Sequence, residues 1–451
     1  MKSSLSKDSL ADVRATLSAA NKKVLAAYPG ESPRRQPVHS VYGGAHLFKA
    51  DTATKLGELA VKSLLDYAPD GETLAVALGF PTSLAARVHQ RVLAKLRREA
   101  VEDFRIDFED GYGPRPDAEE DGHAEAAARQ TALAMAERTL PPFLGIRIKC
   151  LSDELFARAV RTLDVFVTTL MAEAGRLPEN FVITQPKVTA VEQVSALVAV
   201  LDRLEPKVGL APGSLKIELM VETTQSIFGS DGRVALPAMV AATRGRCTGA
   251  HLGTYDYTAA CNVTAAYQSM AHPACDFAKQ VMQVCLAGTG VHLSDGATNV
   301  MPIPPHKDSG AGGLSDEQRR QNRAAVHDIW RLNYRHIRHS LESAFYQGWD
   351  LHPAQLPVRY AAVYAFFLEG LEAASGRLLA FMGKAAQATL LGDVFDDAAT
   401  GQGLLNFFLR GLACGALTEA EVLQGGLTPG ELQSRSFSSI LKGRQLRGAV
   451  P

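Results

Sequence analysis

The 451-residue sequence has little of what ties a protein to a membrane, a nucleic acid or an oxidising compartment. No apolar run is long enough to span a bilayer, and Met1-Lys2-Ser3-Ser4 leads into polar sequence without the apolar core of a signal peptide. The 47 Lys and Arg residues balance the 48 Asp and Glu residues, so no overall field attracts nucleic acid or acidic lipid. We therefore expect a cytoplasmic protein that acts on a small molecule, without nucleic-acid or membrane partners.

Cysteine is scarce as well, and no two cysteines form a C-x-x-C pair. Several lie inside apolar segments, which favours reduced thiols in the protein core over disulfides or a zinc site. The histidines show no H-x-x-x-H or H-E-x-x-H pattern, so they do not indicate zinc either. The six cysteines are Cys150, Cys247, Cys261, Cys275, Cys285 and Cys414.

What the sequence does contain is 46% hydrophobic residues arranged as short β-rich runs that alternate with longer helical patterns. This alternation predicts parallel β/α units, and eight such runs predict a (β/α)₈ TIM barrel. A ninth apolar run, Thr73–Gly79, is either an insertion after the first helix or a replacement for the first strand. The eight predicted strands are Val38–Tyr42, Asp103–Phe108, Leu144–Ile148, Phe181–Thr184, Leu215–Val221, Thr248–Gly253, Val291–Ser294 and Gly348–His352.

The predicted barrel has an appendage at each end of the chain. Residues 1–37 read as a helical arm that ends near Ala27, followed by a linker rich in Pro and Gly. Residues 38–355 form the barrel, with insertions near 69–100 and 307–345, the second carrying a long helix from Ser315 to about Ala344. Residues 356–451 read as a helical C-terminal extension with no further strand.

Charged residues gather just after the predicted strands, where a parallel barrel places its active site. Asp107, Glu109 and Asp110 follow the second strand, either as a solvated acidic turn or as carboxylates around a cation or a water network. Arg147 lies within the apolar third strand, where its guanidinium suits a substrate carboxylate or an enolate oxygen. Pairing of Arg147 with a structural carboxylate is the alternative.

Two further carboxylates follow successive strands. Glu222 comes directly after the apolar fifth strand, and Asp256 follows the sixth. Each alone could cap a helix, but as a pair they can supply both anionic ligands of a Mg²⁺ ion that keeps positions open for water and substrate. Asp396 stands in a polar segment that reads as a turn between two helices, where Asp often caps.

Together these segments resemble the HpcH/HpaI aldolase and citrate lyase superfamily, especially its citrate lyase β-subunit-like and malate synthase-like branch. The resemblance spans about residues 38–405 and depends on the order of the motifs and their placement at strand ends. The matching segments are Asp107 with Glu109 and Asp110, Ile146-Arg147-Ile148, Pro186-Lys187-Val188, Val221-Glu222-Thr223, Gly253-Thr254-Tyr255-Asp256, Gly348 to Gln355, and Gly392-Asp393-Val394-Phe395-Asp396.

The resemblance implies a carbon–carbon lyase or condensing enzyme that forms an enolate from a small 2-oxo or 2-hydroxy acid or its coenzyme A thioester. It assigns Mg²⁺, with Mn²⁺ as an alternative, to Glu222 and Asp256. It makes Arg147 a catalytic and substrate-binding residue and Asp396 an acid/base that is delivered into a neighbouring subunit, and it therefore implies a homo-oligomer, a trimer or a hexamer. Gly253 and Thr254 would contact the substrate, and the metal's waters would be oriented by Asp107, Glu109 and Asp110.

The sequence also departs from that family. The loop after the first strand, Tyr42 to His46, lacks the usual V-P-G motif. Asp110 stands where the class II aldolases carry a histidine, which disfavours a histidine-based mechanism. The two insertions leave the substrate and the use of coenzyme A open. A thioesterase or a phosphoenolpyruvate-handling enzyme on the same barrel, and a non-catalytic barrel protein, remain as alternatives.

Overall fold

A computed structural model describes residues 4–5, 8–30, 34–307, 313–383, 389–391, 394–396 and 398–446. Eight parallel strands close into a barrel in the order β1 to β8, with β1 hydrogen-bonded to β8. The predicted (β/α)₈ TIM barrel is therefore confirmed, and each predicted strand overlaps an observed one. The barrel strands are β1 (His39–Gly44), β2 (Asp103–Asp107), β3 (Phe143–Arg147), β4 (Phe181–Gln185), β5 (Lys216–Val221), β6 (Cys247–Leu252), β7 (His292–Ala297) and β8 (Gln347–Asp350).

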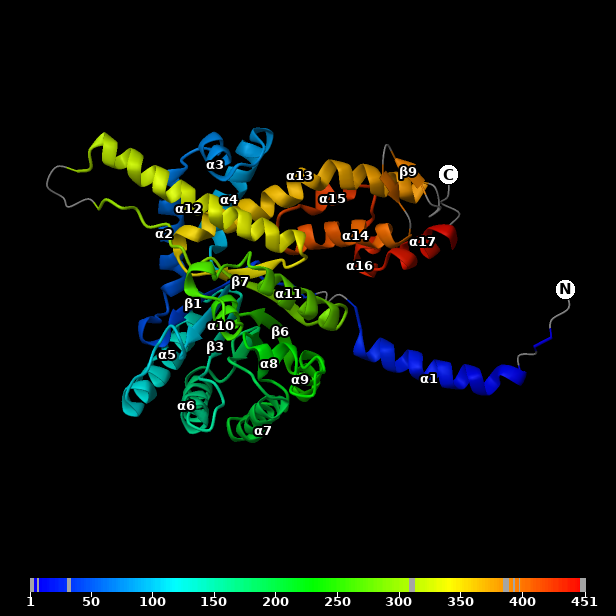
Figure 1. Ribbon diagram of the computed structural model, residues 1–451, viewed down its shortest axis with the longest axis horizontal. Coiled ribbons are helices and arrows are strands. Elements are labelled where there is room, and N and C mark those ends of the chain that lie inside the picture. Colours follow the sequence, from blue (N-terminus) through cyan, green and yellow to red (C-terminus); the bar gives the residue numbers. More distant parts are fainter. Residues whose placement is uncertain are drawn as a thin grey trace.

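Helices surround the barrel, and most of the connections between strands contain at least one of them (Figure 1). Large apolar side chains such as Phe108, Phe166 and Trp330 are fully buried between the strands and these helices. The helices that follow β1 to β7 are α2 (Thr52–Tyr67), α3 (Gly71–Leu78), α4 (Ala85–Glu99), α5 (Asp117–Glu137), α6 (Phe156–Ala174), α7 (Val191–Lys207), α8 (Thr224–Ile227), α9 (Leu236–Ala242), α10 (Thr254–Ala260), α11 (Pro273–Leu286) and α12 (Asp316–Glu342).

The run Thr73–Gly79 is part of a helix and not a ninth strand. The Asp70 side chain accepts the Thr73 backbone N–H at 2.8 Å and caps the start of α3, and Gly79 ends it with a left-handed φ of 85°. A short apolar run has the same composition in a buried helix as in a buried strand, so its hydrophobicity alone does not separate the two. The long helix expected from Ser315 is α12, with Ser315 as its N-cap.

The C-terminal extension is helical, as expected, but it also contains two short strands. β9 (Thr389–Leu391) pairs antiparallel with β10 (Val394–Asp396), so the expectation of no further strand was wrong. Strands of three residues are too short to show a periodic pattern in the sequence. The helices of this extension are α13 (Leu356–Gly383), α14 (Ala398–Ala413), α15 (Glu419–Gln424), α16 (Pro429–Ser434) and α17 (Phe437–Leu446).

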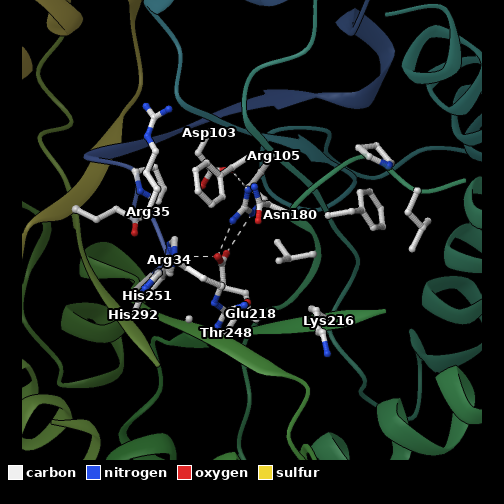
Figure 2. A pocket seen from close by; sticks show the side chains of 18 of the residues that line it. Arg34, Arg35, Asp103, Arg105, Asn180, Lys216, Glu218, Thr248, His251 and His292 are labelled. Atoms are coloured by element: carbon white, nitrogen blue, oxygen red, sulfur yellow. Dashed lines mark hydrogen bonds and ion pairs between the residues drawn. The ribbon is translucent and has the colours of Figure 1, made fainter. Parts of the chain in front are cut away.

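A buried ionic network fills the interior of the barrel near the end where the strands begin (Figure 2). Arg105 of β2 pairs with Asp103 on its own strand and donates to both carboxylate oxygens of Glu218 on β5, at 2.6 and 3.2 Å. His251 Nε2 lies 2.9 Å from Glu218, and His251 Nδ1 accepts the Trp349 indole N–H at 3.0 Å. The charged groups of this network are therefore paired with one another.

A cavity of about 350 Å³ opens beside this network and is partly apolar. Its walls come from the beginnings of the strands and from the linker before β1, and its lining includes Arg34, Phe143, Phe181, Lys216 and His292. All six cysteines are free thiols. Among the described residues, no helix has the length and apolar character needed to cross a membrane.

Candidate active site

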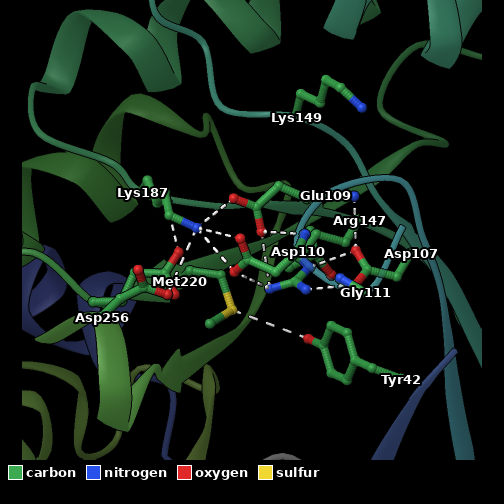
Figure 3. Close-up of polar contacts among 12 residues, drawn as sticks. Tyr42, Asp107, Glu109, Asp110, Gly111, Arg147, Lys149, Lys187, Met220 and Asp256 are labelled. Carbon is green, nitrogen blue, oxygen red and sulfur yellow. Dashed lines mark hydrogen bonds and ion pairs between the residues drawn. The ribbon is translucent and has the colours of Figure 1, made fainter. Parts of the chain in front are cut away.

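The opposite end of the barrel, where the strands finish, holds the side chains that the sequence singled out (Figure 3). Arg147 ends β3, Asp107 ends β2, and Glu222 follows β5. Asp256 lies in the first turn of α10, directly after β6. Parallel strands bring residues far apart in sequence to this one rim of the barrel, and the charges of Arg147 and Asp256 act on Glu222 there.

Arg147 is buried and held in a fixed orientation. Its Nε and Nη2 atoms donate to the two oxygens of Asp107 at 2.7 and 2.5 Å, which is a bidentate pair. Its Nη1 atom lies 3.1 Å from Glu109, and its guanidinium stands 4.9 Å from the ring centre of Tyr42. One edge of Arg147 therefore pairs with a carboxylate of the barrel, Asp107, which was one of the two expected roles. Its Nη1 atom faces Glu109.

Glu222 is a carboxyl group whose surroundings disfavour its ionised form. It is only 2% exposed, and its carboxylate accepts the backbone N–H of Lys187 at 2.7 Å. Burial raises the pKa of Glu222, the Lys187 and Arg147 charges oppose that rise, and repulsion from Asp256 adds to it, so that the pKa is about 7. An ionised Glu222 therefore calls for a further cation.

Gly253 makes room for that carboxylate. A Cβ atom at position 253 would lie 2.6 Å from the Glu222 Cβ and would collide with the carboxylate itself. The glycine of the predicted G-x-x-D segment is required by this close approach. The Gly253 backbone N–H donates to the carbonyl oxygen of Val221 at 3.0 Å, which ties Gly253 to the end of β5. Thr254 is buried at the start of α10.

Lys187 is the residue that sequence reasoning missed. It follows β4 with a left-handed φ of 48°, and its ammonium group pairs with Glu109, with Asp110 at 2.9 Å and with Asp256 at 3.6 Å (Figure 3). Its backbone and side chain together touch four carboxylates. The available signal was its place in Pro186-Lys187-Val188, a charged residue directly after a buried strand.

The acidic run after β2 is organised by this lysine and by Arg147. Burial raises the pKa of Glu109, and the neighbouring Arg147 and Lys187 charges only partly offset it. For Asp110 the order is reversed: burial opposes ionisation, but the Lys187 hydrogen bond and the Arg147 charge outweigh it and lower the pKa. Asp107, Glu109 and Asp110 contact Arg147 and Lys187, and their expected role in orienting metal-bound water stays a prediction.

The residues at this rim fit a hard divalent cation. Glu222 and Asp256 offer oxygen ligands, and Glu222 carries a buried negative charge that a cation would compensate. Within the described part of the chain, no three His, Cys, Asp or Glu side chains converge on one point. Two carboxylates with the other positions left to water and substrate is the donor set that Mg²⁺ often uses.

Two aromatic side chains lie beneath the charged rim. The Tyr42 and Trp349 rings stack with centres 4.2 Å apart, and the Tyr42 hydroxyl points toward the sulfur of Met220 at 4.0 Å. They separate the charged rim from the Glu218 network below. The backbone of Asp396 ends β10, and its side chain lies outside the described residues, so its predicted catalytic role stays a prediction.

Comparison with known proteins shows which family the chain belongs to. The model of a family described as a domain of unknown function (DUF6986) matches residues 17–440. The chain belongs to this family. No curated protein matches the sequence.

Solved structures resemble the fold of this DUF6986 member. A citrate lyase from Burkholderia xenovorans LB400 is 19% identical with a TM-score of 0.55, and the match covers 87% of this chain and 96% of that one. At this identity the likeness shows the barrel fold alone. A malate synthase from Haloferax volcanii is 13% identical with a TM-score of 0.46, covering 90% of this chain and 98% of its own.

Proposed function

We propose that this protein is a Mg²⁺-dependent carbon–carbon lyase or condensing enzyme. Its substrate would be a small 2-oxo or 2-hydroxy acid or the coenzyme A thioester of one, and the reaction would pass through an enolate. The observation that carries the proposal is the pair Glu222 and Asp256 at the strand ends, where burial, with repulsion from Asp256, raises the pKa of Glu222 to about 7. The barrel shared with a citrate lyase and the order of the motifs support it.

Glu222 and Asp256 would hold the ion, Mg²⁺ or alternatively Mn²⁺, which when bound supplies Lewis-acid polarisation of the substrate oxygens. Arg147 would stabilise the negative charge that develops on the enolate oxygen. Asp107 grips two donor atoms of Arg147, so the guanidinium is already oriented before substrate arrives. This preorganisation avoids a rearrangement during the reaction.

A proton must also move at the enolising carbon. In the condensing direction, Asp396 would take that proton as the C–H electron pair moves into the enolate; in the cleaving direction it would return the proton to the same carbon. Asp396 follows the barrel by some forty residues in the C-terminal extension. Delivery of Asp396 into a neighbouring subunit's site, within a homo-oligomer, is part of the proposal.

The same motifs support membership of the HpcH/HpaI aldolase and citrate lyase superfamily, in its citrate lyase β-subunit-like and malate synthase-like branch. The stacked Tyr42 and Trp349 rings and the ion pairs of Lys187 add two further features to this site. Tyr42 would form part of the floor on which the acid rests. Lys187 would neutralise Glu109 and Asp110, so that Arg147 keeps a donor for the substrate.

A substrate panel tests the proposal. 2-Oxo acids, acyl-CoA thioesters, 2-hydroxyacyl-CoA thioesters and phosphoenolpyruvate would be assayed with Mg²⁺ and with EDTA, following C–C cleavage or formation and thioester hydrolysis separately. We expect Mg²⁺-dependent C–C chemistry that is lost in Glu222→Gln and Asp256→Asn. The control is Asp328→Asn on the exposed face of α12, which should keep full activity. Full turnover in EDTA, or thioester hydrolysis alone, would overturn the proposal.

A further inference from the structure

The helix α1 (Ala11–Ala27) extends away from the barrel, and none of its residues is buried (Figure 1). An isolated helix of 17 residues is marginal in water, because the cost of nucleation is repaid only by packing or by a longer helix. Its exposed apolar side chains include Val13 at 57%, Leu17 at 58% and Val24 at 57%. The arm therefore has a surface that the described part of its own chain does not cover.

Six apolar residues of the arm have the spacing of a coiled-coil seam, and Leu25, which is 70% exposed, lies outside it. They occur at intervals of three, four, three, four and three residues, which keeps them on one side of a helix that winds around a partner helix. The seam consists of Leu10, Val13, Leu17, Ala20, Val24 and Ala27. It begins in the turn Asp8–Leu10 that precedes α1 and runs to the last residue of the helix.

This seam is complementary to itself when two copies run antiparallel. A two-fold axis between Leu17 and Ala20 places Leu17 against Ala20, Val13 against Val24, and Leu10 against Ala27 of the other copy. Each leucine then meets an alanine, which is the large-to-small arrangement that fills a helix interface without voids. A parallel pair would instead place Ala20 on Ala20 and Ala27 on Ala27 and would leave gaps.

The charges favour the same arrangement. Asp8 and Asp12 lie at the start of the arm, and Lys22 and Lys23 lie toward its end. Antiparallel pairing brings Asp8 and Asp12 toward Lys22 and Lys23 of the other copy, whereas parallel pairing brings the two Lys22-Lys23 pairs together. Arg14, the remaining cation of α1, would lie beside Asn21 of the second copy.

The base of the arm offers more apolar surface where the partner helix would end. A groove of about 750 Å³ is lined there by the last residues of α1 together with Val240 of α9 and Cys285 and Leu286 of α11. Leu10 of the second copy, which reaches Ala27 in the antiparallel pair, arrives at this groove. The seam and the groove thus form one continuous surface.

We propose that α1 binds the α1 of a second copy of this chain as an antiparallel, two-fold helix pair. The two barrels would lie at opposite ends of a pair about 25 Å long, at 1.5 Å per helical residue. The pairing joins two chains, or two larger assemblies, and it is independent of the reaction proposed for the barrel.

Light scattering coupled to size-exclusion chromatography of the full chain tests the pairing. Leu17→Glu buries a charge at the centre of the seam, and we expect it to halve the mass of the native assembly. Ser18→Glu adds the same charge one residue away, outside the seam, and should leave the mass unchanged. A monomeric native protein at tens of micromolar, or an equal effect of both variants, would overturn the proposal.

Disulfide trapping tests the direction. Val13→Cys mixed with Val24→Cys should form a crosslinked dimer under mild oxidation. Val13→Cys alone should form no more crosslinked dimer than the native protein, whose six cysteines set the background. A crosslink in Val13→Cys alone would show a parallel pair and contradict the model. If neither sample crosslinks above background, α1 does not pair with itself.

Discussion

Glu218 and Glu222 lie on the same side of β5 and its continuation, four residues apart and almost equally buried. Their surroundings nevertheless shift their pKa values in opposite directions. Glu218, at the end where the strands begin, accepts hydrogen bonds from Arg105 and Thr184 and pairs with His251. Burial opposes its ionisation, but these partners outweigh it and hold its pKa well below the ordinary value. Glu222, at the other end, has a pKa raised to about 7.

The difference shows that the presence of a cavity does not by itself indicate which end of this barrel would bind a cation. The cavity of about 350 Å³ lies beside Glu218, where the charges are already paired (Figure 2). The end with Glu222 and Asp256 carries negative charge that Lys187 and Arg147 only partly balance. Uncompensated buried charge marks a site for a cation or a reacting group, and paired buried charge holds the barrel together.

The largest expected effect breaks the network at the Glu218 end. Glu218→Ala removes one partner of Arg105 and leaves a buried guanidinium short of a counter-charge, so we expect a loss of about 3–5 kcal/mol in the free energy of unfolding. Glu222→Gln removes a charge that is already disfavoured and should cost little. Urea denaturation of both variants measures this, and equal losses would remove the distinction between the two ends.

The pH dependence of stability sharpens the same comparison. Because the pKa of Glu222 is about 7 in the folded protein and 4.5 ordinarily, the folded state binds the extra proton between these pH values. The free energy of unfolding contributed by Glu222 therefore falls as pH rises from about 4.5 to 7, by roughly 3 kcal/mol at about 1.4 kcal/mol per unit. The free energy of unfolding is measured against pH, without metal, for the native protein and for Glu222→Gln. The difference between the two isolates this fall. A flat difference would contradict the raised pKa.

Mg²⁺ should reverse that fall. The ion binds the ionised form, so at pH 8 a concentration one hundred times its Kd should stabilise the folded protein by about 2.7 kcal/mol. Thermal unfolding with and without Mg²⁺ would show the shift, and Asp256→Asn should lose most of it. Asp328→Asn serves as the control on an exposed helix face. An undiminished shift in Asp256→Asn would place the ion elsewhere.

The smallest expected effect concerns Lys187. Lys187→Met removes a cation from beside Glu109, Asp110 and Asp256, so the local potential becomes more negative and the affinity for Mg²⁺ should rise severalfold. Lys216→Met, which changes the same residue type at the other end of the barrel, should leave the affinity unchanged. Calorimetric titration measures both. A weaker affinity in Lys187→Met would mean that the lysine helps to build the metal site.

The sequence predicted what depends on local pattern and strand order. The eight strands, the barrel and the placement of Glu222 and Asp256 after successive strands all follow from the alternation of apolar runs and charged residues. The run at Thr73 was ambiguous because a buried helix and a buried strand share its composition. β9 and β10 were missed because each has only three residues.

The partners of the charged residues could not be predicted, because they depend on register across the barrel. Arg105 meets Glu218 more than a hundred residues later, and Lys187 meets Glu109 and Asp110 from a strand two positions away. For Arg147 the sequence left substrate binding and structural pairing as alternatives. One side of its guanidinium pairs with Asp107, and the other lies 3.1 Å from Glu109. These partners are visible only in the folded chain, and substrate binding by Arg147 stays a prediction.

The most direct test of the central claim is anomalous diffraction from crystals soaked in Mn²⁺, an ion that replaces Mg²⁺ and can be located by its own signal. The account predicts one strong peak at the rim where the strands end, with carboxylate oxygens of Glu222 and Asp256 at about 2.1 Å. A rim without such a peak, or a strong peak beside Glu218 instead, would contradict it.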